Sequence, residues 1–182
     1  MLKKRVITAI CLLPLLVVAV WFDKPLPWLT IFVAIWGVLA ALEFYSVVAA
    51  SNQKVLPLTS FGLIWTLLFI LSPYLDHTHY YTYLTPLLLT SAVVLPPIWL
   101  LLRDQKEGAF LSWVWTTAGI LYIGWLLSHF VALRGLESGR EWVLFALFIT
   151  FTSDSAAYFV GRAWGRHRLA PGISPRKTWE GA

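Results

Sequence analysis

Charged residues are scarce in this sequence. Only 13% of its 182 residues are Asp, Glu, Lys or Arg, whereas 59% are hydrophobic. A soluble domain carries roughly 25% charged residues, so there is too little polar surface here to cover a water-facing globule. The composition excludes an ordinary soluble domain and predicts an all-α, polytopic transmembrane helical bundle.

Cysteine is nearly absent, and long polar tracts and the common nucleotide-binding loops are missing. The single Cys11 lies in an apolar run, which excludes a disulfide framework or a Cys-based metal site and favours a buried, inert thiol. The sequence contains no long polar or Ser/Gly-rich stretch, so we expect no disordered tail or flexible linker. Neither Gly-x-x-x-x-Gly-Lys-Ser/Thr nor Gly-x-Gly-x-x-Gly occurs, so a standard nucleotide-binding fold is not expected.

Six apolar segments are near the roughly 20 residues needed to cross a bilayer. The first resembles a signal peptide, but it is longer than a usual apolar core and lacks a small-residue cleavage site, so we expect a retained helix. Pro96-Pro97 should kink the fourth segment, which a membrane helix tolerates when neighbours satisfy the freed carbonyls. The predicted spans are 6–22, 28–50, 60–75, 85–102, 111–133 and 142–160, of which 60–75 is the shortest.

The basic residues predict the orientation. With the N-terminus in the cytoplasm, the outside loops hold only Lys24, Arg134 and Arg140, and the other eleven of the 14 Lys and Arg lie inside. This asymmetry follows the positive-inside rule. The net charge of +5 is therefore explained by membrane topology, and no nucleic-acid partner is expected.

Two carboxylates fall within the predicted spans, Glu43 and Asp154. A charge at the bilayer centre costs about 2.5–3.5 kcal/mol on insertion scales, so each needs a reason. For Glu43, a structural pairing or a reach to the interface is as good an explanation as a site role. Asp154 shares a helical face with Tyr158 and Arg162 at four-residue spacing, which predicts a polar face for a water-soluble substrate. A structural Asp–Arg pair is the alternative.

A second ladder on the same helix consists of small residues, Ala157, Gly161 and Gly165. Small residues at this spacing let another element approach closely. We therefore expect the ladder to serve packing and not ligand contact.

Five basic residues and one carboxylate follow in 161–182. Ser174 is a favoured N-cap and Pro175 a favoured first helical residue, so a helix is predicted to begin there. Arg176 and Lys177 in its first turn would oppose the helix dipole unless a phosphate docks. His167 is interpreted as a further phosphate or lipid contact. A basic patch that only touches anionic headgroups is the alternative.

This C-terminal region resembles the phosphatidate cytidylyltransferase (CDP-diacylglycerol synthase) family. The similarity is carried by Ser153-Asp-Ser-Ala-Ala-Tyr-Phe-Val-Gly-Arg162, by Gly165-Arg-His-Arg-Leu-Ala-Pro171 and by Ile173-Ser-Pro-Arg-Lys-Thr-Trp-Glu-Gly181. The opening Met-Leu-Lys-x-Arg helix and the Leu-Ala-Ala-x-Glu stretch around Glu43 are weaker similarities.

The resemblance implies a bacterial inner-membrane enzyme, active at the cytoplasmic face, that transfers the cytidylyl group of CTP to phosphatidic acid with Mg²⁺ as cofactor. It implies catalytic roles for Asp154 and Lys177, with Asp154 also the metal ligand. It implies substrate contacts for Tyr158, Arg162, Ser174, Arg176, Thr178 and Glu180. Membrane lipids are the remaining partners, and a homodimer is compatible with the sequence, which leaves the oligomeric state open.

The resemblance also predicts the domain organisation. Residues 1–141 correspond to transmembrane helices one to five, and 142–182 to the start of the catalytic region. The family continues past Ala182 with a Lys-Asp and His-Gly-Gly-x-x-Asp-Arg type signature that supplies metal-binding carboxylates. None of it occurs in this sequence, so we expect a truncated chain that is inactive alone.

Three other functions fit parts of the pattern. A CTP-dependent lipid-alcohol kinase would share the Asp…Gly-Arg region, although the Ser-Pro-Arg-Lys-Thr-Trp-Glu run favours the cytidylyltransferase. A secondary transporter could couple ions through Asp154 and Glu43, but it predicts internal repeats, which are not found. A non-catalytic scaffold would use the basic cluster only to bind lipid.

Overall fold

The computed structural model describes residues 14–22, 27–51, 55–75, 84–102, 107–172 and 174–182, without the side chains of Pro175 and Arg176. They form two compact units, Met1–Arg140 and Glu141–Ala182. Cys11 and the start of the predicted first span lie outside the described residues, and 14–21 are helical.

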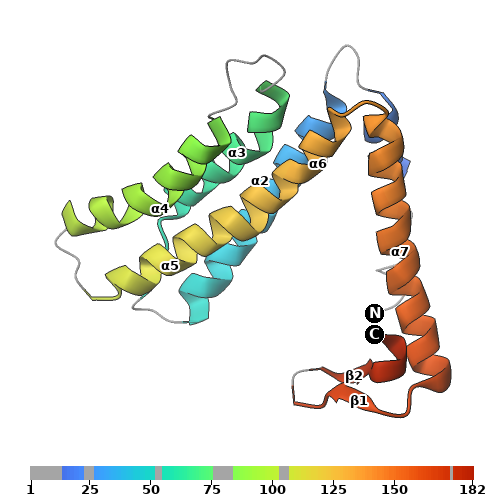
Figure 1. Ribbon diagram of the computed structural model, residues 1–182. Helices are drawn as coiled ribbons and strands as arrows, with labels where there is room; N and C mark the ends of the chain where they lie inside the picture. Colours follow the sequence, from blue (N-terminus) through green and yellow to red (C-terminus); the bar gives the residue numbers. More distant parts are fainter. Residues whose placement is uncertain (1–13, 23–26, 52–54, 76–83, 103–106, 173) are drawn as a thin grey trace. The chain divides into compact units, whose positions relative to one another are not determined.

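The helices follow the predicted apolar segments closely (Figure 1). Four are long and apolar enough to cross a membrane, and α3 is a shorter apolar helix. This confirms an all-α architecture with several membrane helices in the part of the chain that is described. The bounds are α2 Trp28–Ser51, α3 Thr59–Leu75, α4 Leu84–Leu102, α5 Ala109–Gly119, η1 Ile120–Trp125, α6 Leu126–Arg134 and α7 Gly139–Trp164. Of these, α5, η1 and α6 follow one another without a break and form one continuous helix.

Helix α3 is the centre of the first unit. It packs against α2, α4, η1 and α6, and Figure 1 shows it among them. Its neighbours bury Phe69 and Ile70 completely. Close approach depends on Gly124 in the π-helical turn η1, because a Cβ there would lie 2.8 Å from the Thr66 Cα. The short 17-residue helix is thus held in the bundle by contacts on several sides.

The prolines inside the helices leave carbonyls that side chains satisfy. A proline removes the N–H that would bond the carbonyl four residues earlier, so Pro96 and Pro97 free the carbonyls of Ala92 and Val93. Thr117 donates to the Ala92 oxygen at 3.4 Å, and the Trp113 indole to the Val93 oxygen at 3.0 Å. Both donors come from α5, so the expected compensation by a neighbouring helix is confirmed.

Pro73 in α3 is compensated in a similar way from within its own helix. It frees the carbonyl of Phe69, and the Ser72 hydroxyl donates to that oxygen at 2.8 Å. Unpaired backbone groups are costly where no water can reach them, which explains why a polar donor accompanies each of these prolines.

The second unit consists of α7 followed by a β-hairpin and a short 3₁₀ turn. Strands β1 (Arg168–Ala170) and β2 (Ser174–Thr178) are antiparallel, and η2 (Trp179–Gly181) follows. The helix predicted to start at Ser174 is therefore wrong. Ser174 precedes a proline, which disfavours the helical region, and the turn at Pro171-Gly172 directs 174–178 back along β1.

Candidate functional site

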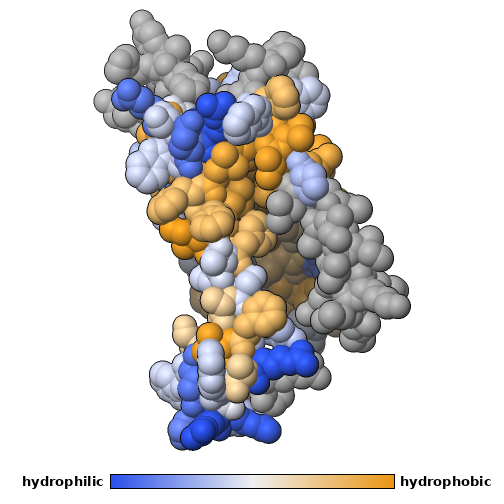
Figure 2. Space-filling view, turned by 90° about the vertical axis from the view of Figure 1, so that its right-hand side faces the viewer, coloured by the Kyte–Doolittle hydropathy of each residue, from blue (hydrophilic) through white to orange (hydrophobic). Residues whose placement is uncertain are grey.

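The polar residues of the second unit lie toward the end of α7 and on the hairpin. In Figure 2, orange side chains predominate along the upper part of α7, and blue side chains gather over the hairpin at the lower end. Two aromatic residues at this boundary, Trp164 and Trp179, are 70% and 65% exposed. Indole side chains prefer the level of lipid headgroups, so the change in polarity along this unit fits a membrane–water boundary.

Asp154, Tyr158 and Arg162 all lie on α7 and are exposed. The Arg162 guanidinium donates to the Tyr158 hydroxyl at 3.0 Å, which confirms that their four-residue spacing brings them together. Within the described part of this unit, Asp154 has no hydrogen bond or ion pair, so the alternative of an Asp154–Arg162 pair finds no support there. Asp154 is thus an exposed carboxylate on the same helix as the Tyr158–Arg162 contact.

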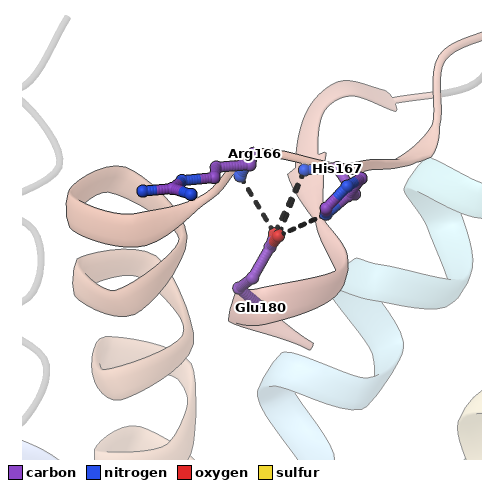
Figure 3. A network of polar contacts seen from close by, with 3 residues as sticks. All are labelled: Arg166, His167 and Glu180. Carbon is purple, nitrogen blue, oxygen red and sulfur yellow. Dashed lines mark hydrogen bonds and ion pairs between the residues drawn. The ribbon is translucent and has the colours of Figure 1, made fainter.

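Glu180 closes the hairpin onto the residues that follow α7 (Figure 3). Its Oε2 accepts from the Arg166 backbone N–H at 3.1 Å, and its Oε1 from the His167 backbone N–H at 3.2 Å. The His167 ring Nδ1 lies 2.8 Å from the same Oε1. The Trp179 N–H donates to the His167 carbonyl at 2.9 Å. We call this set of contacts among Arg166, His167, Trp179 and Glu180 the clasp.

These contacts favour the ionised form of Glu180. Its own backbone N–H is the largest contributor, the His167 ring is the next, and together with the other donors they lower the pKa of this carboxyl to about 2. Because an ionised carboxylate can only accept hydrogen bonds, the proton of the hydrogen bond to His167 is on Nδ1.

The small-residue ladder of α7 receives the C-terminal turn. A Cβ on Gly161 would lie 3.0 Å from the Thr178 Oγ1, and one on Gly181 would lie 2.6 Å from the Ala157 carbonyl oxygen. A Cβ on Gly165 would also meet the Thr178 side chain, at 2.7 Å. The ladder therefore serves packing, as expected. Within this unit, the element that packs there is the turn of the same chain.

The predicted residues of the hairpin differ in their surroundings. Lys177 is exposed on β2, Ser174 is half-buried, and the Thr178 hydroxyl is buried against α7 without a hydrogen-bond partner. The backbone of Arg176 belongs to β2, whereas its side chain lies outside the described residues. Lys177 thus lies on the exposed surface of β2, while Thr178 is directed toward the helix.

The partnership of His167 with Glu180 was missed by the sequence reasoning. The two residues are 13 positions apart, a spacing that no helix or strand periodicity brings together. Only the turn at 171–172 makes them neighbours. A hairpin signal could have been taken from Pro171-Gly172, but it would not have identified this pair.

The site fits a magnesium ion only through Asp154. No group of three or more His, Cys, Asp or Glu side chains occurs among the residues the structure describes. Mg²⁺, however, commonly takes one or two carboxylates and completes its shell with waters and substrate phosphates. A single exposed carboxylate on the polar face of α7 is compatible with a magnesium ion that has one carboxylate ligand and takes its other ligands from water and phosphate.

Comparison with known proteins identifies the family. The model of the family described as "Cytidylyltransferase family" matches residues 3–182. The chain belongs to this family. The match includes both structural units and hence the polar face of α7, the clasp and the hairpin.

Curated relatives of this cytidylyltransferase-family chain include three bacterial phosphatidate cytidylyltransferases. That of Brucella suis is 40% identical over 84 residues, which are 46% of this chain and 30% of the relative. That of Bacillus subtilis is 39% identical over 66 residues, 36% of this chain and 24% of the relative. That of Staphylococcus haemolyticus is 32% identical over 78 residues, which are 43% of this chain and 29% of the relative.

The matched segments thus cover less than a third of the length of these relatives. No solved structure matches the chain. Family membership is established by the sequence match over residues 3–182.

Proposed function

We propose that this protein is a phosphatidate cytidylyltransferase, which converts CTP and phosphatidic acid into CDP-diacylglycerol and pyrophosphate. The observation that carries the proposal is the continuity of the second unit. A helix apolar enough to cross a membrane bears Asp154 and Arg162 on its polar part and leads into a basic hairpin. A lipid substrate and a water-soluble nucleotide could both reach such a site, and membership of the cytidylyltransferase family supports the chemistry.

The reaction requires two polyanions to meet. A phosphatidate oxygen attacks the α-phosphorus of CTP, a new P–O bond forms, and the bond to the bridging oxygen of the β-phosphate breaks, so that pyrophosphate leaves. The phosphatidate oxygen is already anionic, so no strong base is needed. The main task of the protein is to screen repulsion and to align the reactants.

The residues of the site suit this task in distinct ways. Lys177 and Arg162 would bind phosphate oxygens, with Arg162 oriented by its contact with Tyr158. Ser174 and Arg176 would extend the phosphate-binding surface along β2. Thr178, whose hydroxyl is buried, would support the surface through packing.

Asp154 would hold Mg²⁺, which when bound screens the charge of the phosphates. The proposal places the basic hairpin at the cytoplasmic face of a bacterial inner membrane, where positive residues are retained. Residues 1–141 would act as the membrane scaffold and 142–182 as part of the catalytic region.

One assay tests the proposal. The protein expressed from its complete gene is purified and given phosphatidic acid, labelled CTP and Mg²⁺. We expect CDP-diacylglycerol and pyrophosphate. Release of CDP with phosphorylation of a lipid alcohol would instead identify a kinase, and no turnover of CTP with either lipid would refute both enzymatic functions.

A further inference from the structure

Glu180 has a different environment from the cationic residues around it. Its side chain is 28% exposed, whereas that of His167 is 78% exposed. Both carboxylate oxygens accept hydrogen bonds from residues 13 or 14 positions earlier in the chain. The carboxylate is therefore engaged by donors of its own chain on both oxygens, which argues against a direct contact with a substrate phosphate.

The donors identify what the carboxylate holds. Arg166 and His167 directly precede β1, and Glu180 directly follows β2 and Trp179. The clasp therefore joins the two ends of the hairpin at the side where the chain leaves α7. Without the contacts of the Glu180 side chain, the pairing of Arg168 with Thr178 and the Trp179–His167 backbone bond would remain at that end.

The same contact orients the imidazole of His167. With Nδ1 directed at Glu180, the other ring nitrogen, Nε2, lies on the opposite side of an exposed ring. When a carboxylate accepts a hydrogen bond from one ring nitrogen, it fixes the tautomer of the neutral ring and leaves the other nitrogen without a proton. His167 thus has a defined orientation next to Arg166 and Arg168.

We propose that Glu180 is a positioning residue: through the clasp it holds the basic hairpin against the end of α7 and orients His167, so that Lys177 and Arg168 are prepared to bind anionic phosphate. This inference rests on the proposed function for the identity of the phosphate, which belongs either to CTP or to phosphatidic acid. Glu180 itself does not touch the substrate.

The clasp is tested first without any assay of activity. The complete protein, labelled with ¹⁵N-histidine, is compared with Glu180→Ala, and the His167 signals are assigned from His167→Gln. We expect the Nδ1–H tautomer of neutral His167 in the unsubstituted protein and its loss in Glu180→Ala. We also expect trypsin to cleave after Arg168 and Lys177 about tenfold faster in Glu180→Ala, because local opening controls such cleavage.

Gly172→Ala is the matched control on the same hairpin. A Cβ at this position would have no heavy atom within 4 Å, so this variant should keep both the tautomer and the trypsin resistance. If Glu180→Ala also keeps both, the clasp does not exist in the protein and the inference is overturned.

The functional part of the inference is tested by kinetics. We expect Glu180→Ala to raise the KM for the bound phosphate compound about tenfold or more, the loss typical of hydrogen bonds to a charged group, with a smaller change in kcat. If only the KM for CTP rises, the phosphate bound by the hairpin belongs to the nucleotide. If only the KM for phosphatidic acid rises, it belongs to the lipid. Glu180→Gln, which retains an oxygen for the backbone donors, should recover part of the loss.

Two results separate this inference from the proposed function. If the clasp is lost in Glu180→Ala and both KM values stay unchanged, Glu180 has no positioning role, although the cytidylyltransferase activity stands. If the unsubstituted protein makes no CDP-diacylglycerol, the proposed function and the phosphate-binding role fall together, whereas the tautomer and trypsin results still decide whether the clasp exists.

Discussion

Two acidic residues of the second unit, Asp154 and Glu180, have opposite surroundings. Asp154 is exposed and has no polar contact within the described part of its unit, whereas Glu180 accepts hydrogen bonds from Arg166 and His167. An unpaired carboxylate on a membrane helix is costly and suggests a ligand. A carboxylate with several donors is a structural element. Exposure and partners thus predict different consequences of substitution at the two positions.

Asp154→Asn and Lys177→Ala should both reduce cytidylyl transfer strongly. We expect a loss of about 100-fold or more in kcat/KM, because each removes a charge aimed at the phosphates of the transition state. The measurement is the release of pyrophosphate by the purified protein with CTP, phosphatidic acid and Mg²⁺. Ser155→Ala, next to Asp154, and Gly172→Ala, in the turn of the hairpin that carries Lys177, should remain active. Near-normal turnover in either charge variant would remove that residue from the site.

The ionisation of Glu180 gives a prediction about pH. Since its folded-state pKa is lowered from 4.5 to about 2, the stability that the clasp contributes is fully present above pH 4.5. It is lost as the pH falls from 4.5 toward 2. In protein labelled with ¹³C at the glutamate carboxyl, one signal should titrate near pH 2 and should be missing in Glu180→Gln. His167→Gln should raise that midpoint, and a midpoint near 4.5 in the unsubstituted protein would contradict the hydrogen bonds.

Among the elements, helices α3 and α4 contain prolines and depend on side-chain donors for the carbonyls these prolines free. For α4 the donors come from α5, so α4 and α5 are connected by polar contacts. The sequence predicted that neighbours would compensate Pro96 and Pro97, but it could not name Trp113 and Thr117. Their identity depends on the register between two helices, which packing decides.

Trp113→Phe should destabilise the first unit because it leaves the Val93 carbonyl without its donor. Interhelical hydrogen bonds in a membrane average about 0.6 kcal/mol and reach about 1.7 kcal/mol, and we expect a loss in this range. It is measured by SDS-induced unfolding in mixed micelles.

Pro97→Ala provides the matched background, because it restores the N–H that bonds Val93 within α4. Trp113→Phe should therefore cost less in the Pro97→Ala protein than in the unsubstituted one. Equal costs in the two backgrounds would show that the indole contributes through packing alone.

For the whole molecule, orientation in the membrane is the remaining prediction. The positive-inside rule assigns the hairpin to the cytoplasm and the turn between α6 and α7 to the outside. In a Cys11→Ser background, Gly172→Cys should react with an impermeant thiol reagent only after the membrane is opened. Glu137→Cys, in the turn after α6, should react in intact spheroplasts. The reverse pattern would contradict both the orientation and a cytoplasmic site.

The sequence alone determined the helices of this protein, because a span across hydrocarbon requires a continuous apolar segment and this requirement is local. It also determined the proximity of Tyr158 and Arg162, which follows from helical spacing. Tertiary structure decided the rest of the site. The stretch from Ser174 to Thr178 carries both a helix-start signal and a pre-proline preference for extended backbone, and pairing with β1 made it a strand. The contact of Glu180 with His167 depends on that hairpin, since no local periodicity joins residues 13 positions apart.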